Sequence, residues 1–161
     1  MSKKRPRTES SYVEDHIGLN LAGVAPKSAV QQFFDRYTGR RADNTAFYFM
    51  NKRNQQSVIA TLITPALGDR HFSGQQCSDK KTAEQSAATV FVEDVEVLEI
   101  AACLPPPLAT IRRIADGYHS RKQKLVAKGL SPKEAVEQLV LEIYETLRDK
   151  GCRTALWDGH L

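Results

Sequence analysis

The sequence predicts a mixed α+β fold in which an α-β-β-β-α unit is followed by a C-terminal helical hairpin. Three observations support this prediction. Apolar residues recur at helical spacing between Pro26 and Gly39 and again from residue 80 onward. The segments between these two helices are short and rich in aromatic and β-branched residues, as strands are. Beyond residues 104–107, the remaining apolar pattern is helical only.

The first helix is expected to begin at Pro26, because proline fits the first helical turn, and to end at Gly39. Two strands are predicted next: residues 46–50 are aromatic and residues 58–64 are β-branched. Residues 52–56 are the polar turn expected between these strands.

A third strand is predicted over residues 70–76, after a turn at residues 65–69. The second helix then begins with the adjacent lysines Lys80 and Lys81. The helix dipole, the backbone N–H groups and two ammonium groups are expected to meet at this point, which suits a phosphate.

The chain after this helix start has two interpretations. Val95, Leu98 and Ala102 continue the apolar stripe of the helix, so the helix is able to extend to residue 102. Residues 95–100 also alternate in the manner of a strand.

Two amphipathic helices joined by a short turn are predicted beyond the prolines, as an antiparallel hairpin. The first contains Ile111 and is stopped by Gly129. The second opens at residues 131–134, whose Ser-Pro-Lys-Glu sequence is a capping box, and Gly151 is expected to end it. The proline run at 104–107 is interpreted as a short stiff spacer in polyproline II form.

One face of the second hairpin helix is the predicted partner-binding surface. A two-helix hairpin rarely buries enough surface to stand alone, so this face must meet either the sheet domain or another chain. We therefore expect self-association or a protein partner. The face consists of Val136, Leu139, Val140, Ile143 and Leu147.

The expected domain plan has four parts. Residues 1–25 form a flexible basic arm, 26–103 the α-β-β-β-α domain, 104–107 the spacer and 108–161 the hairpin with its tail. The basic cluster at residues 3–7 is a nuclear-import signal, a nucleic-acid arm or a solubilising tail. An intracellular location is expected, nuclear in the first case and cytoplasmic otherwise.

The charge distribution is compatible with nucleic acid but does not require it. The 161 residues carry a formal net charge of +4. Residues 26–91 hold nine basic and five acidic residues, whereas all charged residues of 92–107 are acidic. The positive charge therefore lies mainly in the predicted α-β-β-β-α domain.

No catalytic, cofactor or metal site is predicted. The histidines and the three cysteines have neither zinc-ligand spacing nor the pattern of a disulfide framework. The acid-rich residues 93–99 suggest a Mg²⁺ site as one interpretation, but they lie on one continuous segment, and a solvated face explains them better. The absence of any run of about 18 apolar residues argues against a membrane span. We expect a non-enzyme.

Two motifs together resemble the double-stranded-RNA-binding domain family. The first is Pro26-Lys27-Ser28-x-Val30-Gln31-Gln32 at the opening of the first helix. The second is Lys80-Lys81-x-Ala83-x-x-x-Ala87-Ala88 at the opening of the second helix. The resemblance covers residues 26 to about 94.

The sequence departs from the family pattern at four places. Glu84 replaces a basic residue, Asp79 replaces the common serine, and Gln32 replaces a glutamate. The loop at 52–56 lacks the family's Gly-Pro-x-His segment. Glu84 lies one turn from Lys80 and can pair with it, and a carboxylate that faces RNA phosphates would weaken binding.

The resemblance implies non-catalytic binding of double-stranded RNA by shape and phosphate contacts, in a small subunit or cofactor of an RNA-processing or ribonucleoprotein complex. The alternative is a degenerate fold that serves as a protein-interaction or dimerisation module. The RNA contacts implied are Lys27, Gln31 and Gln32 on the first helix, Lys52, Arg53 and Gln55 on the loop, and Lys80 and Lys81 on the second helix.

Overall fold

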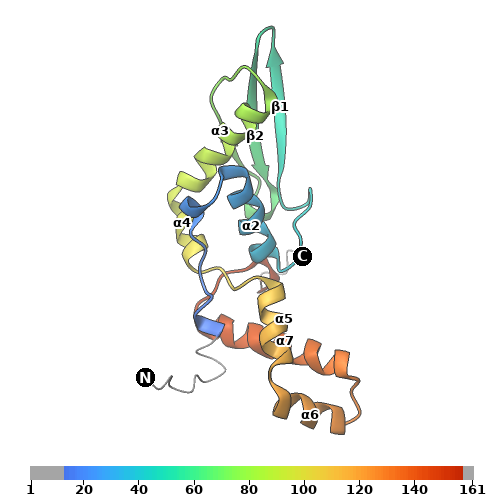
Figure 1. Cartoon of the computed structure of the whole chain (residues 1–161). Coiled ribbons are helices and arrows are strands. Elements are labelled where there is room, and N and C mark those ends of the chain that lie inside the picture. Colours follow the sequence, from blue (N-terminus) through green and yellow to red (C-terminus); the bar gives the residue numbers. More distant parts are fainter. Residues whose placement is uncertain (1–12, 158–161) are drawn as a thin grey trace, which may run out of the picture. The chain divides into compact units, whose positions relative to one another are not determined.

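The computed structural model describes residues 13–157, which contain six α-helices and one three-stranded antiparallel sheet (Figure 1). The chain divides into two compact units. The described part of the helical unit is residues 13–17 and 105–152, and that of the sheet unit is residues 18–104 and 153–157. The mixed α+β class predicted from the sequence is confirmed.

The sheet has the strand order β1-β2-β3, with β1 at Tyr48–Asn54, β2 at Ser57–Thr64 and β3 at Arg70–Ser73. β3 pairs only with the last four residues of β2, whereas β1 pairs with β2 along its whole length. The β1–β2 hairpin therefore extends beyond β3 as the long ribbon in Figure 1.

The turn between β1 and β2 is shorter than predicted. Asn54 pairs with Ser57, so only Gln55 and Gln56 remain unpaired, and Gln55 has a positive φ of 26°. Positive φ is typical of two-residue hairpin turns. Lys52 and Arg53 therefore lie in β1, and the prediction of a five-residue loop at 52–56 was wrong.

The third strand also ends earlier than predicted, at Ser73. Gly74 follows it, where a Cβ atom would lie 2.5 Å from the backbone nitrogen of Ala87. Only glycine allows the chain to pass so close to α3 (Lys80–Glu93).

Helices α2 (Pro26–Thr38) and α3 cover one face of the sheet and supply most of its core. Gly39 ends α2 in the left-handed conformation, as predicted. The ring of Phe91 lies 5.1 Å from those of Phe33 and Phe72, so it joins α3 to both α2 and β3.

The second predicted helix does not continue to residue 102. α3 ends at Glu93, and a separate helix, α4 (Val95–Ala102), begins after Asp94. The Asp94 carboxylate accepts a hydrogen bond from the Val97 N–H at 3.1 Å, and so caps α4. This break turns Leu98 to solvent, and it excludes a strand at 95–100.

Residues 18–25, which were predicted to belong to a flexible arm, are packed in the sheet unit. The backbone N–H groups of Gly18 and Leu19 donate to the carbonyls of Leu104 and Ala101, at 2.9 and 2.8 Å. Leu21 is buried in the short helix η1 (Leu21–Gly23). Residues 18–25 thus belong to the sheet unit, while the basic cluster at 3–7 lies outside the described residues and its role in nuclear import stays a prediction.

The C-terminal segment returns to the sheet unit. The Thr154 hydroxyl donates to the Tyr37 carbonyl, and Ala155 of η3 (Ala155–Trp157) is buried in the core. Part of the predicted tail is therefore packed against α2.

Residues 105–152 of the helical unit contain three helices instead of the two predicted: α5 (Leu108–Asp116), α6 (His119–Ala127) and α7 (Pro132–Asp149). The predicted first helix breaks at Gly117 because glycine is a poor helix former, and the Tyr118 side chain turns into the interior. The capping box at the start of α7 is confirmed by hydrogen bonds in both directions between Ser131 and Glu134.

The predicted partner-binding face is not available to a partner in this structure. α5 and α6 pack on α7, which buries Leu139, Val140, Ile143 and Leu147 and leaves Val136 partly buried. α5 contributes the buried residues Ile111, Ile114 and Ala115 to this packing, whereas no residue of α6 is buried. A protein partner for the chain itself stays a prediction.

The proline run is not an exposed spacer. Leu104, Pro105 and Pro106 are buried, and Pro107 is the N-cap of α5. The boundary between the two units falls between Leu104 and Pro105. Within residues 13–157, no helix combines the length and the apolar character that crossing a membrane requires.

Candidate nucleic-acid interface

The N-terminal ends of α2 and α3 lie side by side. The Lys27 backbone N–H donates to the Gln85 side-chain oxygen at 3.2 Å, and the Lys27 ammonium donates to the Glu84 carboxylate at 2.7 Å. The positive ends of two helix dipoles therefore lie close together.

Glu84 faces the interior and not the solvent. It is 8% exposed, and its second oxygen accepts a hydrogen bond from the Asn51 amide of β1 at 2.9 Å. Burial raises the pKa of Glu84, but the hydrogen bonds from Asn51 and Lys27 outweigh burial and hold the pKa below its ordinary value. Glu84 thus joins three elements as an anion: its ion pair is with Lys27, and Lys80 adds only a weaker Coulombic attraction.

Lys80 and Lys81 lie in the first turn of α3, and both are exposed. The Asp79 carboxylate caps this helix by accepting the Thr82 N–H at 2.8 Å, and this bond lowers the pKa of Asp79. The predicted lysine pair therefore lies exposed at the start of α3, beside the Asp79 cap.

Strand alternation separates the two basic residues of the β1–β2 hairpin. Asn51 reaches Glu84, so it lies on the face of the sheet that α3 covers, and Arg53 shares that face. Lys52 lies on the opposite face, beside its cross-strand partner Ile59. Arg53 therefore lies on the face of the sheet that carries α3, whereas Lys52 does not.

The two predicted glutamines of α2 differ in their surroundings. The Gln31 amide donates to the Asp35 carboxylate at 2.7 Å and to the Ala42 carbonyl at 3.3 Å, so it holds the loop after α2. Gln32 is exposed on the same helix, and Gln55 is exposed at the hairpin turn.

Sequence reasoning did not identify Asn51. Its role depends on strand register: Asn51 precedes Arg53 by two residues and pairs with Ala60, on the helix-covered face. If the turn had been predicted as Gln55 and Gln56 alone, strand alternation would have placed Asn51 on the helix-covered face. The predicted five-residue loop concealed it.

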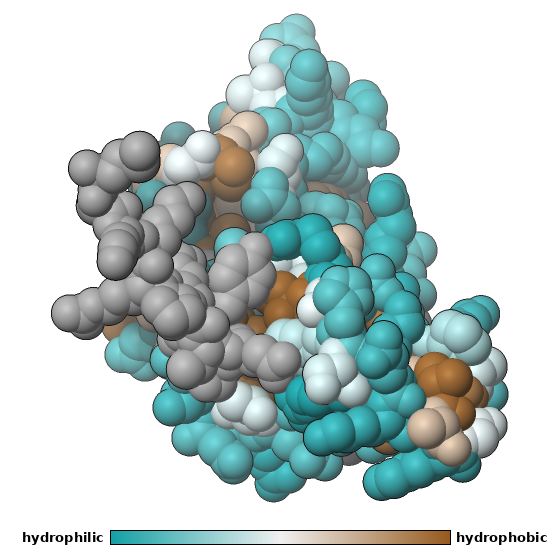
Figure 2. Space-filling model, turned by 60° about the horizontal axis from the view of Figure 1, so that its bottom comes forward, coloured by the Kyte–Doolittle hydropathy of each residue, from teal (hydrophilic) through white to brown (hydrophobic). Residues whose placement is uncertain are grey.

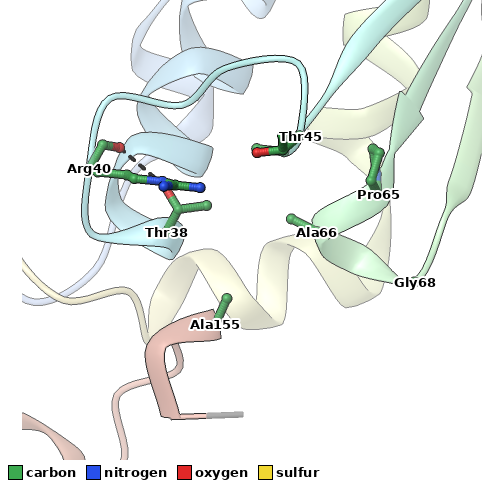
Figure 3. A pocket seen from close by; sticks show the side chains of 8 residues that line it. Thr38, Arg40, Thr45, Pro65, Ala66, Gly68 and Ala155 are labelled. Atoms are coloured by element: carbon green, nitrogen blue, oxygen red, sulfur yellow. Dashed lines mark hydrogen bonds between the residues drawn. The ribbon is translucent and has the colours of Figure 1, made fainter. Parts of the chain in front are cut away.

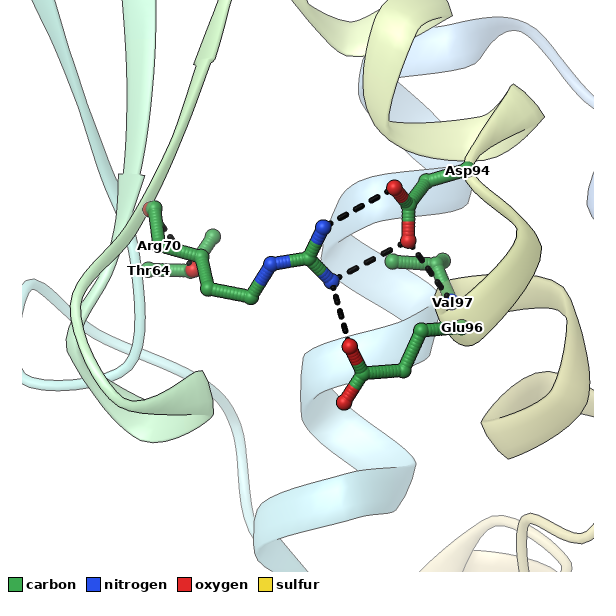
Figure 4. Close-up of polar contacts among 5 residues, drawn as sticks. All are labelled: Thr64, Arg70, Asp94, Glu96 and Val97. Atoms are coloured by element: carbon green, nitrogen blue, oxygen red, sulfur yellow. Dashed lines mark hydrogen bonds and ion pairs between the residues drawn. The ribbon is translucent and has the colours of Figure 1, made fainter.

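A second polar cluster, shown in Figure 4, joins β3 to the break between α3 and α4. The Arg70 guanidinium binds both oxygens of Asp94, at 2.9 and 3.1 Å, and reaches Glu96 at 3.1 Å. The hydrogen bonds from Arg70 lower the pKa of Asp94. Asp94 of the acid-rich segment is therefore structural, whereas Glu93, Glu96 and Glu99 are exposed, as expected of a solvated face. No cluster of three potential metal-binding side chains occurs among the described residues.

The sheet unit also contains a cavity of 510 Å³ beside the C-terminal end of α2 (Figure 3). Its polar lining comes from Thr38, Arg40 and Thr45, and the Thr38 hydroxyl donates to the Arg40 carbonyl at 3.1 Å. Lys27 stands at the other end of α2, so this cavity is separate from the basic cluster at the start of α3.

The comparisons with protein families, with curated proteins and with solved structures found no match to this chain.

Proposed function

We propose that the sheet unit is a double-stranded-RNA-binding-type domain that binds duplex RNA without catalysis or a cofactor. The observation that carries this proposal is the α3 cluster, which we define as Arg53, Lys80 and Lys81, beside a Glu84 whose charge is turned inward. Its order of elements, α-β-β-β-α, supports the same proposal.

The α3 cluster suits the phosphates of a duplex. Lys80 and Lys81 add two ammonium groups to the N–H groups and the dipole of the α3 start, where an anion is stabilised. Arg53 adds a guanidinium, which binds phosphate oxygens through two parallel hydrogen bonds. The contact is one of charge and shape, so it carries no sequence preference.

The β1–β2 hairpin provides a separate contact. Its turn presents two exposed amides, Gln55 and Gln56, which both donate and accept hydrogen bonds. Ribose 2′-hydroxyls in the shallow minor groove of A-form RNA have the same dual character. Such contacts would distinguish RNA from DNA, and they fit a small subunit or cofactor of an RNA-processing or ribonucleoprotein complex.

A different observation favours the alternative, a protein-interaction module. The face of the sheet opposite the helices exposes Tyr48, Met50 and Ile59, at 37%, 57% and 38% of their surface. Large apolar side chains gathered on one face are more typical of a protein contact than of a phosphate contact. This face is distinct from the α3 cluster, so both functions can exist in one chain.

The deciding experiment compares RNA and DNA duplexes of equal length, about 16 base pairs. Fluorescence anisotropy would measure the affinity of the full chain for each at about 50 mM and about 200 mM salt. We expect the RNA duplex to bind more tightly, with an affinity that falls steeply as salt rises. Equal affinity for both duplexes, or no binding at the lower salt, would reject the RNA proposal.

A further inference from the structure

The helical unit contains a basic segment that the proposed function does not use. Residues 117–133 include no acidic residue. They form α6, the turns on either side of it and the start of α7. The basic residues in this segment are Arg121, Lys122, Lys124, Lys128 and Lys133, together with His119.

α6 contributes little to the core. None of its nine residues is buried, and its packing is against α7. A helix of this length is marginal in isolation, and helices in proteins are usually stabilised by burying an apolar face. The surface of α6 is therefore mostly open to solvent.

Two of the cations on α6 have partners within the helical unit. Arg121 forms an ion pair with Glu142 of α7, and Lys122 binds Asp116 at 2.7 Å. Lys124 and Lys128 are exposed, and neither forms an ion pair with any residue between 13 and 157. These two ammonium groups therefore add positive charge at the C-terminal end of α6 that no carboxylate of residues 13–157 pairs with.

A hollow of 460 Å³ lies against the same helix. Three of the side chains that line it are hydrogen-bond donors and none is a carboxylate, although one of the three, Lys122, already binds Asp116. It is lined by His119, Lys122, Gln123, Val126, Ala127 and Pro132.

We propose that α6 and the turn that follows it bind the phosphate backbone of the same duplex RNA, as a second contact. This proposal rests on the proposed function of the sheet unit. The chain passes between the two units three times, after residues 17, 104 and 152, so the units are tethered. Tethering makes the second binding event intramolecular, and a weak contact then adds measurably to the total affinity.

An anionic membrane would attract the same charges, but α6 lacks the apolar face that membrane-surface helices need. Val126, at 40% exposure, is its only exposed large hydrophobic residue. Figure 2 shows one face of the surface, which outside the grey atoms is mostly hydrophilic with separate hydrophobic patches. The phosphate backbone of a nucleic acid matches this surface better than a membrane does.

The test uses the full chain and the double variant Lys124→Glu with Lys128→Glu. Anisotropy titrations with an RNA duplex of about 32 base pairs, twice the length that one such domain covers, would give the affinity at several salt concentrations. We expect weaker binding and a slope of log K against log salt that is smaller by about 1.8, or about 0.9 for each lost phosphate contact.

The matched control is Arg41→Glu with Arg148→Glu. It changes the net charge equally, at exposed positions outside both basic surfaces. Thermal unfolding should be similar for the wild type and both variants, because all four side chains are exposed. An equal loss of affinity in the two double variants would show that net charge alone explains the effect, and it would overturn the proposal.

The remaining outcomes separate the two proposals. If the α6 variant binds RNA as well as wild type while Lys80→Ala with Lys81→Ala does not, the second contact is wrong and the proposed function stands. If the wild type binds no duplex RNA, both fail. If the α6 variant loses binding only to phosphatidylcholine–phosphatidylserine vesicles, the surface is a lipid site and the RNA contact is rejected.

Discussion

The Lys27 ammonium and the Glu84 carboxylate form an ion pair at 2.7 Å that joins the N-terminal ends of α2 and α3. Glu84 also accepts the Asn51 amide, so one buried carboxylate joins both helices to β1. This arrangement removes a negative charge from the surface beside Lys80 and Lys81. It also makes Lys27 a structural residue as well as a candidate RNA contact.

Replacing Glu84 should destabilise the sheet unit. Glu84→Ala leaves Lys27 and Asn51 without their acceptor, and we expect a loss of about 1–3 kcal/mol in the free energy of unfolding. Lys27 is partly exposed, so solvent reduces its share of this loss. Urea denaturation would measure it, with Glu99→Ala on the exposed side of α4 as the control. An equal and small effect in both variants would contradict the structural role of Glu84.

The Glu84 pairing predicts a pH dependence of stability. Its pKa is lower in the folded chain than its ordinary value of 4.5, so the carboxylate stabilises the fold above pH 4.5. This contribution is lost as the pH falls through the folded pKa, because the carboxyl group of the unfolded chain has the higher pKa and takes up a proton first. We therefore expect the unfolding free energy of the wild type to exceed that of Glu84→Gln by a constant amount near neutral pH. This difference should shrink as the pH falls into the acid range. A difference that grows as the pH falls would show that the sign is wrong.

Replacing the lysine pair of α3 should weaken RNA binding without affecting the fold. Lys80→Ala with Lys81→Ala removes two exposed charges, so the salt slope should fall by about 1.8. The loss of stability should stay within about 0.5 kcal/mol, as for most surface substitutions. Anisotropy and thermal unfolding on the same samples would check both expectations. Unchanged affinity would place the phosphate contact elsewhere.

The two basic residues of the β1–β2 hairpin should differ in their effects. Arg53 lies on the same face of the sheet as the start of α3, whereas Lys52 lies on the opposite face. Arg53→Ala should therefore weaken binding to duplex RNA more than Lys52→Ala does. The two variants remove one charge each from neighbouring positions, so each controls for the other. Equal losses would indicate that the duplex contacts the tip of the hairpin and not one of its faces.

The sequence predicted the elements whose signals are local. The Ser131–Glu134 capping box, Gly39 and the lysine pair of α3 all lie where they were expected. A cap or a turn depends on residues within three or four positions of one another, and this chemistry is visible in the chain. The three strands were also predicted, although the turn between β1 and β2 was placed too widely and β3 was made too long.

Tertiary structure decided what local patterns leave open. Glu84 has the same sequence neighbours whether it faces solvent or Lys27, which is 57 residues away, and only the packing of α2 on α3 makes that choice. The apolar stripe of α7 likewise predicts that its residues are buried, but it does not show which elements pack against them. In the fold, these elements are α5 and α6. The sequence by itself determined which residues carry charge and which must be buried. The fold determined their partners, because contacts between distant residues depend on how whole elements pack.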